Sequence, residues 1–290
     1  MSGERHTTIP LTRLAAERLA RQGLDNARLE AELLLAAVLE IRRLDLYLQH
    51  ERPLTADEVA SYRDAVRRRL RREPLQYITG EAAFRELVLR VDPRVLIPRP
   101  ETEVLVEEVL RWCHEQERGL LTALDIGTGS GAIAISLALE GPFERIVATD
   151  ISGPALELAA SNAAAAGAAH RIEFREGSLW QALGGIVDVD VIVSNPPYVA
   201  ERDRASLQPD VSDWEPAAAL FAGEDGLTVL RALIDGAARY LRSGGLLALE
   251  VGVGQAATLV ERAQTGGEYR SVRVAQDLAG RERFILLERR

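Results

Sequence analysis

The sequence predicts an α/β protein with a mostly parallel sheet, preceded by a separate domain of helices. From Leu121 onward, short apolar segments alternate with helical patterns, which is typical of a sheet covered by helices on both faces. A glycine-rich loop follows the first of these segments, and two successive prolines end the fourth. Residues 11 to about 72 instead show apolar side chains at helical spacing only. We therefore expect two structural domains in the 290 residues.

The composition is that of an ordinary globular protein, with 47% hydrophobic and 27% charged residues. No apolar run is long enough for a membrane span, and the N-terminus lacks the pattern of a secretory signal. The one cysteine, Cys113, rules out an internal disulfide and a cysteine metal cluster. The four histidines show no ligand spacing. We expect a cytoplasmic protein with no bound metal and no membrane partner.

The charge is unevenly distributed along the chain. Residues 1–80 hold 14 Arg and 12 acidic residues, whereas the remainder holds 21 Arg and 32 acidic residues. Lys is absent, and the net charge is −9. An acidic α/β region is a poor match for duplex DNA, whose affinity for proteins comes largely from neutralised phosphates. We expect no direct DNA binding.

The N-terminal region, residues 1–73, is predicted to be a helical bundle. Thr55 and Glu58 form a capping box, with Leu54 and Val59 placed as the hydrophobic staple of the same helix. That helix ends in an Arg-rich stretch, residues 67–72. Such a cluster could contact RNA or an acidic partner surface, or be a solvated helix face.

Residues 74–100 are predicted to form a linker containing a β-hairpin. Prolines and Gly80 punctuate this stretch, and the segment from Phe84 to Val91 alternates in the manner of strands. A helix is expected from Glu103 to about His114. The third region, 101–290, then contains the α/β domain.

Seven strands are predicted in the α/β domain. Apolar runs bounded by turn residues indicate five of them, and a helix is expected at Pro154–Ala166. A final pair could form an antiparallel edge. The predicted strands are Leu121–Ile126, Arg145–Asp150, Arg171–Glu176, Val189–Ser194, Leu246–Val251, Ser271–Gln276 and Arg283–Glu288.

The loop after the first of these strands has the composition of a nucleotide-binding loop. Its residues are Asp125, Gly127, Thr128, Gly129, Ser130 and Gly131. Glycines permit a tight turn and a close backbone approach, and a helix N-terminus offers unpaired N–H groups. Asp150 ends the second strand, where a carboxylate can accept hydrogen bonds from both ribose hydroxyls. These features predict a cofactor that contains adenosine, and a dinucleotide remains possible because the same loop also fits that pattern.

The fourth strand ends in Asn195-Pro196-Pro197-Tyr198. Proline cannot donate to a sheet, so the strand stops and Asn195 lies at its carboxyl edge, where open α/β sheets bind ligands. The stiff backbone leaves carbonyls and one amide side chain that can accept hydrogen bonds from a planar NH2 group. Asp125 would suit a cofactor with a cationic amino-acid end, and no Lys or suitably placed His indicates nicotinamide chemistry.

These motifs, in this order, resemble the class I S-adenosylmethionine-dependent methyltransferases that act on planar amides or amines. Further stretches, together with the helical N-terminal domain, resemble the bacterial peptide chain release factor N5-glutamine methyltransferases over almost the whole chain. Those stretches are Pro74–Gly80, Val95–Glu103, Glu215–Leu227 and Gly280–Arg283. The resemblance implies a Rossmann-like, mostly parallel seven-stranded sheet, and S-adenosylmethionine as the cofactor.

The resemblance also implies methyl transfer to the side-chain amide nitrogen of a glutamine. That glutamine lies in the Gly-Gly-Gln motif of class 1 peptide chain release factors, which the N-terminal domain would dock. Asn195 and the Pro196 carbonyl would each accept one N–H of the amide, and Pro197 and Tyr198 would shape the slot.

At the cofactor, the resemblance implies that Asp125 holds the methionine ammonium, directly or through the loop, and that Asp150 holds the ribose. Family members usually carry Ser-Asp before an aromatic residue after the third strand. Here Ser178 replaces that aspartate, and Leu179 or Trp180 would line the adenine ring. The segment Glu101 to Glu103 is expected at the pocket wall, without an assigned role.

Three other functions share part of these motifs. A nucleic-acid methyltransferase acting on an adenine or guanine amino group would use the same seat for a flipped base. An NAD-dependent oxidoreductase would share the glycine-rich loop and the acidic residue. A catalytically silent S-adenosylmethionine-binding module would keep the cofactor motifs alone.

Overall fold

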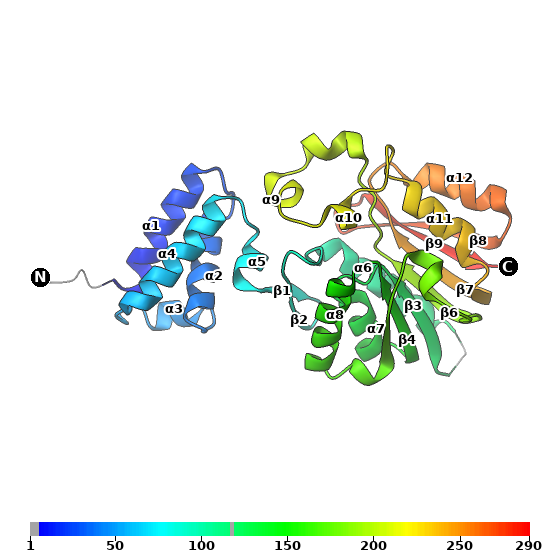
Figure 1. Ribbon diagram of the computed structural model, residues 1–290, viewed down its shortest axis with the longest axis horizontal. Coiled ribbons are helices and arrows are strands. Elements are labelled where there is room, and N and C mark those ends of the chain that lie inside the picture. The colour runs from blue at the N-terminus through cyan, green and yellow to red at the C-terminus, as the bar shows by residue number, and fades with distance from the viewer. Residues whose placement is uncertain (1–5, 117–118) are drawn as a thin grey trace, which may run out of the picture. The chain divides into compact units, whose positions relative to one another are not determined.

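The computed structural model describes residues 6–116 and 119–290 and divides the chain into two compact units (Figure 1). The helical unit comprises the residues up to Glu81 together with Gln208–Trp214. The α/β unit comprises Ala82–Leu207 and Glu215–Arg290. Within the described residues, no helix combines the length and apolar character needed to cross a bilayer.

The helical unit is a bundle around an apolar core to which four of its five N-terminal helices contribute buried side chains. These five helices are α1 (Thr8–Arg21), α2 (Ala27–Val38), α3 (Asp45–Leu48), α4 (Ala56–Leu70) and α5 (Leu75–Thr79). The capping box predicted at the start of α4 is present: Thr55 Oγ1 accepts from Glu58 N at 3.2 Å, and Glu58 Oε2 accepts from Thr55 N at 2.8 Å. Leu19, Leu35 and Tyr62 are fully buried in this core.

The Arg-rich end of α4 serves mainly the helical unit itself. Arg69 is 4% exposed and pairs with Glu30 at 2.7 Å and with Asp210 at 2.7 Å. Arg68 pairs with Glu73 at 2.5 Å. Fewer side chains of the Arg-rich stretch are therefore exposed than the sequence suggests. Arg69 instead joins α4 to α2 and to α9 (Pro209–Ser212), a segment far along the chain.

The linker expected at residues 74–100 is not a separate region. Leu75 and Ile78 of α5 pack against the helical core. The hairpin of β1 (Glu81–Phe84) and β2 (Leu87–Arg90) instead places Phe84 and Leu89 in the core of the α/β unit. The boundary therefore lies at Glu81 and not at residues 73 and 100, because each half of the stretch follows its own apolar contacts.

The α/β unit contains the predicted seven-stranded sheet, in the order β5-β4-β3-β6-β7-β9-β8. β9 runs antiparallel to both of its neighbours, and the other pairings are parallel. The strands are β3 (Leu121–Ile126), β4 (Phe143–Asp150), β5 (Ile172–Glu176), β6 (Val189–Ser194), β7 (Leu241–Glu250), β8 (Tyr269–Gln276) and β9 (Glu282–Arg289). β7 begins five residues earlier than predicted, because the strand continues through an irregularity in its pairing with β6 between Leu241 and Leu246, a stretch in which Gly244 has a φ of +72°.

Helices cover both faces of this sheet (Figure 1). α6 (Pro100–His114), α7 (Ala132–Glu140) and α8 (Gly153–Ala165) contribute to the core on one face. α11 (Thr228–Ala237) and α12 (Ala256–Gly266) contribute to the core on the other. The shorter elements are η1 (Ala169–Arg171), η2 (Leu179–Ala182), η3 (Glu201–Ser206) and α10 (Ala217–Leu220). The strand order reverses between β3 and β6, which is where such folds bind ligands.

Candidate active site

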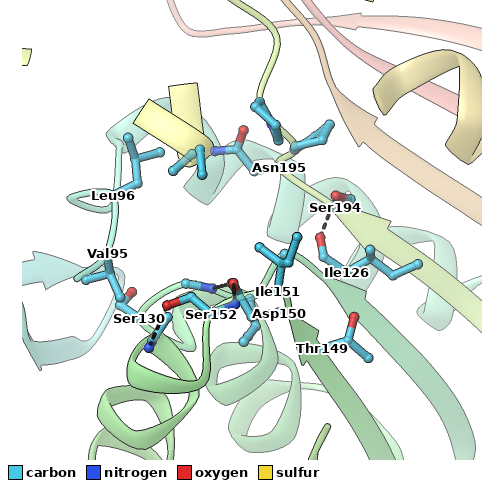
Figure 2. Close-up of a pocket in the computed structure, with 18 of the residues that line it drawn as sticks. Val95, Leu96, Ile126, Ser130, Thr149, Asp150, Ile151, Ser152, Ser194 and Asn195 are labelled. Atoms are coloured by element: carbon cyan, nitrogen blue, oxygen red, sulfur yellow. Dashed lines mark hydrogen bonds between the residues drawn. The ribbon is translucent and has the colours of Figure 1, made fainter. Parts of the chain in front are cut away.

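A cavity of about 370 Å³ lies at the carboxyl ends of β3, β4 and β6, entirely within the α/β unit. Figure 2 shows Asn195 across this cavity from Asp150 and Ser152, with Val95 and Leu96 along one side. The lining is largely apolar. Among the described residues that line it, Arg94 and Asp150 are the ionisable ones. The site can therefore orient a ligand and exclude water, but it offers few groups that could exchange protons.

The glycine-rich loop forms one wall of the cavity, with Gly127, Thr128, Gly129 and Ser130 in the lining. Gly127 and Gly129 have φ of +76° and +54°, and an added Cβ at either would meet nothing within 4 Å. These glycines are needed for the turn, and they leave the backbone open to a ligand. Gly131 lies outside the lining: its φ is +85°, and a Cβ there would come within 3.2 Å of Ala159 in α8.

Asp125 lies behind the loop and not in the cavity wall. Its side chain is fully buried, and Oδ2 accepts from Thr128 Oγ1 at 2.7 Å and from Ala134 N at 3.1 Å. Burial raises the pKa of Asp125 to about 7, against the lowering effect of these hydrogen bonds, and the charge of Asp150 raises it further. Asp125 was expected to hold the methionine ammonium either directly or through the loop, and its placement behind the loop fits the second role.

Asp150 ends β4 and fixes the loop from the opposite side. Its Oδ2 accepts from Gly129 N at 2.9 Å, and its Oδ1 accepts from Ser152 N at 2.9 Å (Figure 2). A carboxylate has further acceptor capacity beyond these two bonds. Asp150 lines the cavity, so it can accept hydroxyl donors from a ligand.

The segment after β5 contributes Ser178 and Leu179 to the cavity, but not Trp180. Leu179 has a φ of +47°, an uncommon conformation for a branched side chain. Trp180 turns toward the core, where its Nε1 donates to Ala232 O at 3.2 Å and its ring stacks on Tyr240 at 4.9 Å. Of the two residues expected to line the adenine ring, only Leu179 is in the cavity wall.

Asn195, Pro196 and Pro197 line the cavity at the end of β6. Ser194 Oγ donates to Ile126 O at 2.6 Å, which joins the ends of β6 and β3 (Figure 2). Asn195 Nδ2 donates to Thr102 Oγ1 at 2.9 Å, and Asn195 Oδ1 is buried without a partner among the described residues. An orphaned buried acceptor is costly, so this oxygen is suited to a donor brought by a ligand.

Tyr198 lies outside the lining, packed against the core. Its hydroxyl donates to Glu250 Oε1 at 3.1 Å and accepts from Arg283 Nη2 at 2.7 Å. Burial raises the pKa of Tyr198 to about 12, and the charge of Glu250 acts in the same direction. Tyr198 therefore supports the proline turn from behind, and does not form the slot itself.

Several lining residues were not identified individually from the sequence. They come from the segments on either side of the cavity: Phe84, Val95, Leu96, Pro98, Pro216, Ala218 and Ala219. Glu215 joins the two sides, since it accepts from Ile97 N at 3.3 Å and pairs with Arg99 at 2.5 Å. The signal was present, because Val95–Glu103 and Glu215–Leu227 were two of the stretches that carried the resemblance.

Thr102 lies in the wall, as expected for the Glu101 to Glu103 segment, but its two neighbours do not. Glu101 pairs with Arg281 at 3.3 Å, and Glu103 accepts from Arg85 N at 3.1 Å. A group of three or more His, Cys, Asp or Glu side chains able to hold a metal does not occur in residues 6–116 and 119–290.

Two family models match the chain. The model described as PrmC N-terminal domain matches residues 11–80, and the one described as Methyltransferase small domain matches residues 102–209. Among solved structures, the T. thermophilus 16S rRNA N2 G1207 methyltransferase is 19% identical with a TM-score of 0.53, covering 72% of this chain and 50% of that one. That likeness shows the fold of the α/β unit alone.

Curated relatives are similar over nearly the whole chain. A release factor glutamine methyltransferase from Geobacter sulfurreducens is 44% identical over 267 residues, which is 92% of this chain and 91% of the relative. One from Moorella thermoacetica is 43% identical over 276 residues, 95% of this chain and 96% of the relative. With this similarity over almost the full length of both chains and with both family domains present, the chain belongs to the release factor glutamine methyltransferase family.

Proposed function

We propose that this enzyme transfers a methyl group from S-adenosylmethionine to the side-chain amide nitrogen of the glutamine in the Gly-Gly-Gln motif of class 1 peptide chain release factors. The observation that carries the proposal is the unpaired Oδ1 of Asn195, held at the cavity by the bond from Nδ2 to Thr102. The names of relatives at 41–44% identity support the choice of substrate.

The residues at the other side of the cavity fit the cofactor. Asp150 can accept hydrogen bonds from ribose hydroxyls, and the open backbone at Gly127 and Gly129 can approach the methionine portion closely. Asp125 holds the loop from behind, and Ser178 and Leu179 lie where an adenine would be walled. When bound, S-adenosylmethionine supplies an electrophilic methyl group on a cationic sulfur.

The chemistry requires placement more than a strong base. An amide nitrogen is a poor nucleophile because its lone pair is delocalised into the carbonyl. Asn195 Oδ1 and the Pro196 carbonyl would accept its two N–H groups and orient the nitrogen toward the methyl group. These residues would hold the nitrogen in place while the N–C bond forms and the S–C bond breaks, and the nitrogen would release one proton to solvent after the transfer. Proximity and orientation can supply on the order of 7–11 kcal/mol.

Among the described residues that line the cavity, none is an acid or histidine placed beside Asn195 as a base, and this supports a reaction controlled by placement. The described ionisable groups of the lining are Arg94 and Asp150, and Arg94 is paired with Asp92 at 2.7 Å. Pro196 and Pro197 cannot donate hydrogen bonds that would compete with the substrate for the acceptors.

The helical unit is proposed to dock the release factor. The match to the PrmC N-terminal domain over residues 11–80 and the contrast in charge with the acidic remainder support this assignment. Arg68, Arg69 and Arg72 are engaged inside the unit. The exposed members of the cluster are Arg67, which forms a surface ion pair with Asp64 at 3.3 Å, and Arg71, and these two are proposed to meet the partner. Charge reversal at both should raise the KM for the factor and leave cofactor affinity unchanged.

The function is tested with labelled S-adenosylmethionine and a purified release factor, followed by mass-spectrometric mapping of the methylated residue. We expect one methyl group on the glutamine of Gly-Gly-Gln and none on a factor in which that glutamine is replaced by asparagine. Ribosomal RNA and DNA serve as alternative acceptors. Label on a nucleobase, or on another residue of the factor, would contradict the proposal.

A further inference from the structure

A buried chain of hydrogen bonds runs from β9 through β7 and α6 to the substrate side of the cavity. Arg283 Nη2 donates to Tyr198 Oη at 2.7 Å and to Glu250 Oε1 at 3.2 Å. Thr102 Oγ1 donates to Glu250 Oε2 at 2.7 Å and accepts from Asn195 Nδ2 at 2.9 Å. Glu250 is 0% exposed and Thr102 is 3% exposed. Glu250 has no role in the methyl transfer as proposed above.

The direction of every hydrogen bond in this chain is determined by its charged end. The guanidinium of Arg283 can only donate, so the hydroxyl of Tyr198 accepts from it and turns its own hydrogen to Glu250. The carboxylate of Glu250 can only accept, so it takes the single hydroxyl hydrogen of Thr102.

The orientation of the Asn195 amide follows from this direction. With its hydrogen committed to Glu250, the Thr102 hydroxyl can only accept from Asn195, and it therefore selects the NH2 end of the amide. Oδ1 is left as the end of Asn195 without a partner. An amide rotated by 180° would present a donor to the donor NH2 group of a glutamine, and the substrate would be repelled.

We propose that Glu250 and Thr102 are positioning residues, which fix the Asn195 amide with its oxygen as the acceptor for the substrate nitrogen. The inference rests on the proposed function, since it concerns the same seat for a planar NH2 group. Burial raises the pKa of Glu250, whereas its ion pair with Arg283 at 3.2 Å favours the carboxylate, and it is in the carboxylate form that the orientation is unique. A neutral group of the same shape could accept from Thr102 or donate to it, and both orientations of Asn195 would then be populated.

The test is the rate of methyl transfer in a single turnover by Glu250→Gln, Thr102→Val and Thr102→Ser. We expect Glu250→Gln and Thr102→Val to lower the rate about 10- to 100-fold, because Asn195 is no longer held in one position, which leaves a substrate N–H unpaired and misplaces the reacting nitrogen. Thr102→Ser keeps the hydroxyl and should stay within about 3-fold of the parent. Cofactor affinity by calorimetry should be unchanged in all three.

A residue that only supports the fold would behave differently in an Asn195→Ala background. There, Glu250→Gln should change the remaining rate less than about 2-fold, because no amide is left to orient. Equal losses in both backgrounds, or failure of Thr102→Ser to restore the rate lost in Thr102→Val, would overturn the proposal. Should Glu250→Gln fail to fold, the Thr102 pair decides. Glu261→Gln, an exposed change on α12, is the matched control.

The parent enzyme separates this proposal from the function on which it rests. Absence of transfer to glutamine by the parent contradicts both. If the parent transfers the methyl group and both Glu250→Gln and Thr102→Val do so at rates within about 2-fold of the parent, the positioning role is contradicted and the proposed function stands.

Discussion

The helical unit and the cavity side of the α/β unit bury acidic side chains in opposite ways. In the helical unit, Glu32 is 5% exposed and contacts Arg28, Arg43 and Tyr47. Burial alone would raise the pKa of Glu32, but the hydrogen bonds from Tyr47 and Arg28 and the charges of both arginines bring it below the ordinary value. Its negative charge is thus favoured by the fold.

At the cavity side, burial prevails over the surrounding donors. Asp125 is held by a hydroxyl and a backbone N–H, and has no ion pair among the described residues. Burial raises the pKa of Asp125 to about 7, and it also raises the pKa of Glu250 and Glu215, although each of these has one arginine partner. Asp190 lies at the amino end of β6, away from the cavity, where it is paired with Arg242 and its pKa is lowered.

The difference indicates what each region is built for. Paired charges in the helical unit stabilise the fold and join segments distant in sequence. Burial makes ionisation of the acids beside the cavity less favourable. These acids instead fix the positions of other groups: Asp125 holds the loop, and Glu250 orients the amide of Asn195 through Thr102. We therefore expect substitutions in the first group to change stability, and those around the cavity to change affinity or rate.

The largest expected effect is on stability, from Arg69→Met. The side chain of Met is of similar length, but Glu30 would be left as a partly buried acid without its arginine, and Asp210 would keep only the longer pair with Arg72 at 3.8 Å. Removing one partner of a buried ion pair typically costs about 3–5 kcal/mol. Hydrogen exchange of the α2 and α4 amides measures this cost within the helical unit.

Two comparisons sharpen the Arg69 test. Arg71→Met, at an exposed position, should have little effect on exchange. Cofactor affinity of the folded Arg69→Met protein should equal that of the parent, because every lining residue belongs to the α/β unit. Unchanged exchange in α2 would show that the Arg69 pairs do not stabilise the unit.

The next effect is a pH dependence from Asp125. Its pKa is about 7 in the folded state and 3.8 in the unfolded reference. A raised folded pKa gives stability that is fully present below pH 3.8 and is lost as the pH rises toward 7. Relative to Asp125→Asn, the parent should therefore lose up to about 4 kcal/mol across this range. Urea titrations of both proteins at pH 4 and pH 8 measure the difference, and a constant difference would contradict the prediction.

The third effect is on rate, from Asn195→Ala. Loss of the acceptor leaves a substrate N–H unpaired and permits misplacement of the nitrogen, so the single-turnover rate should fall at least about 100-fold. Cofactor affinity should change little, since Asp150 and the glycine-rich loop are untouched. If Asn195→Ala transfers the methyl group at the parental rate, Asn195 has no catalytic role and only marks the end of β6, and the proposed mechanism is wrong.

Much of the fold could be predicted because it depends on local patterns. The buried strands β3 and β6 are mostly apolar runs, and their bounds agree with the prediction to the residue. The segment Gln208–Trp214 could not be assigned to the helical unit, since that placement depends on Asp210 meeting Arg69, 141 positions earlier in the numbering. Long-range ion pairs leave no periodicity in the sequence.

The candidate site could be predicted where position along a strand was sufficient. Asp150 and Asn195 lie at the cavity because each follows the carboxyl end of a parallel strand. Side-chain direction was harder to predict: Tyr198 and Trp180 are next to lining residues, but the Glu250 carboxylate and the Ala232 carbonyl draw them away from the cavity. Those partners come from β7 and α11, and no local motif names them.

The smallest of the four effects is on cofactor affinity, from Asp150→Ala. The carboxylate accepts from Gly129 N and Ser152 N and retains capacity for ribose hydroxyls. Hydrogen bonds to a charged group contribute about 1.5–3 kcal/mol, so binding of S-adenosylmethionine should weaken about 10- to 150-fold by calorimetry. Part of that loss could come from a looser loop. An analogue without ribose hydroxyls distinguishes the two causes, because it should bind the parent and the variant alike if the hydroxyls are the partners of Asp150. Equal weakening for both ligands would show that Asp150 acts by holding the loop, as Asp125 does, so that both acids on the cofactor side of the cavity would act indirectly.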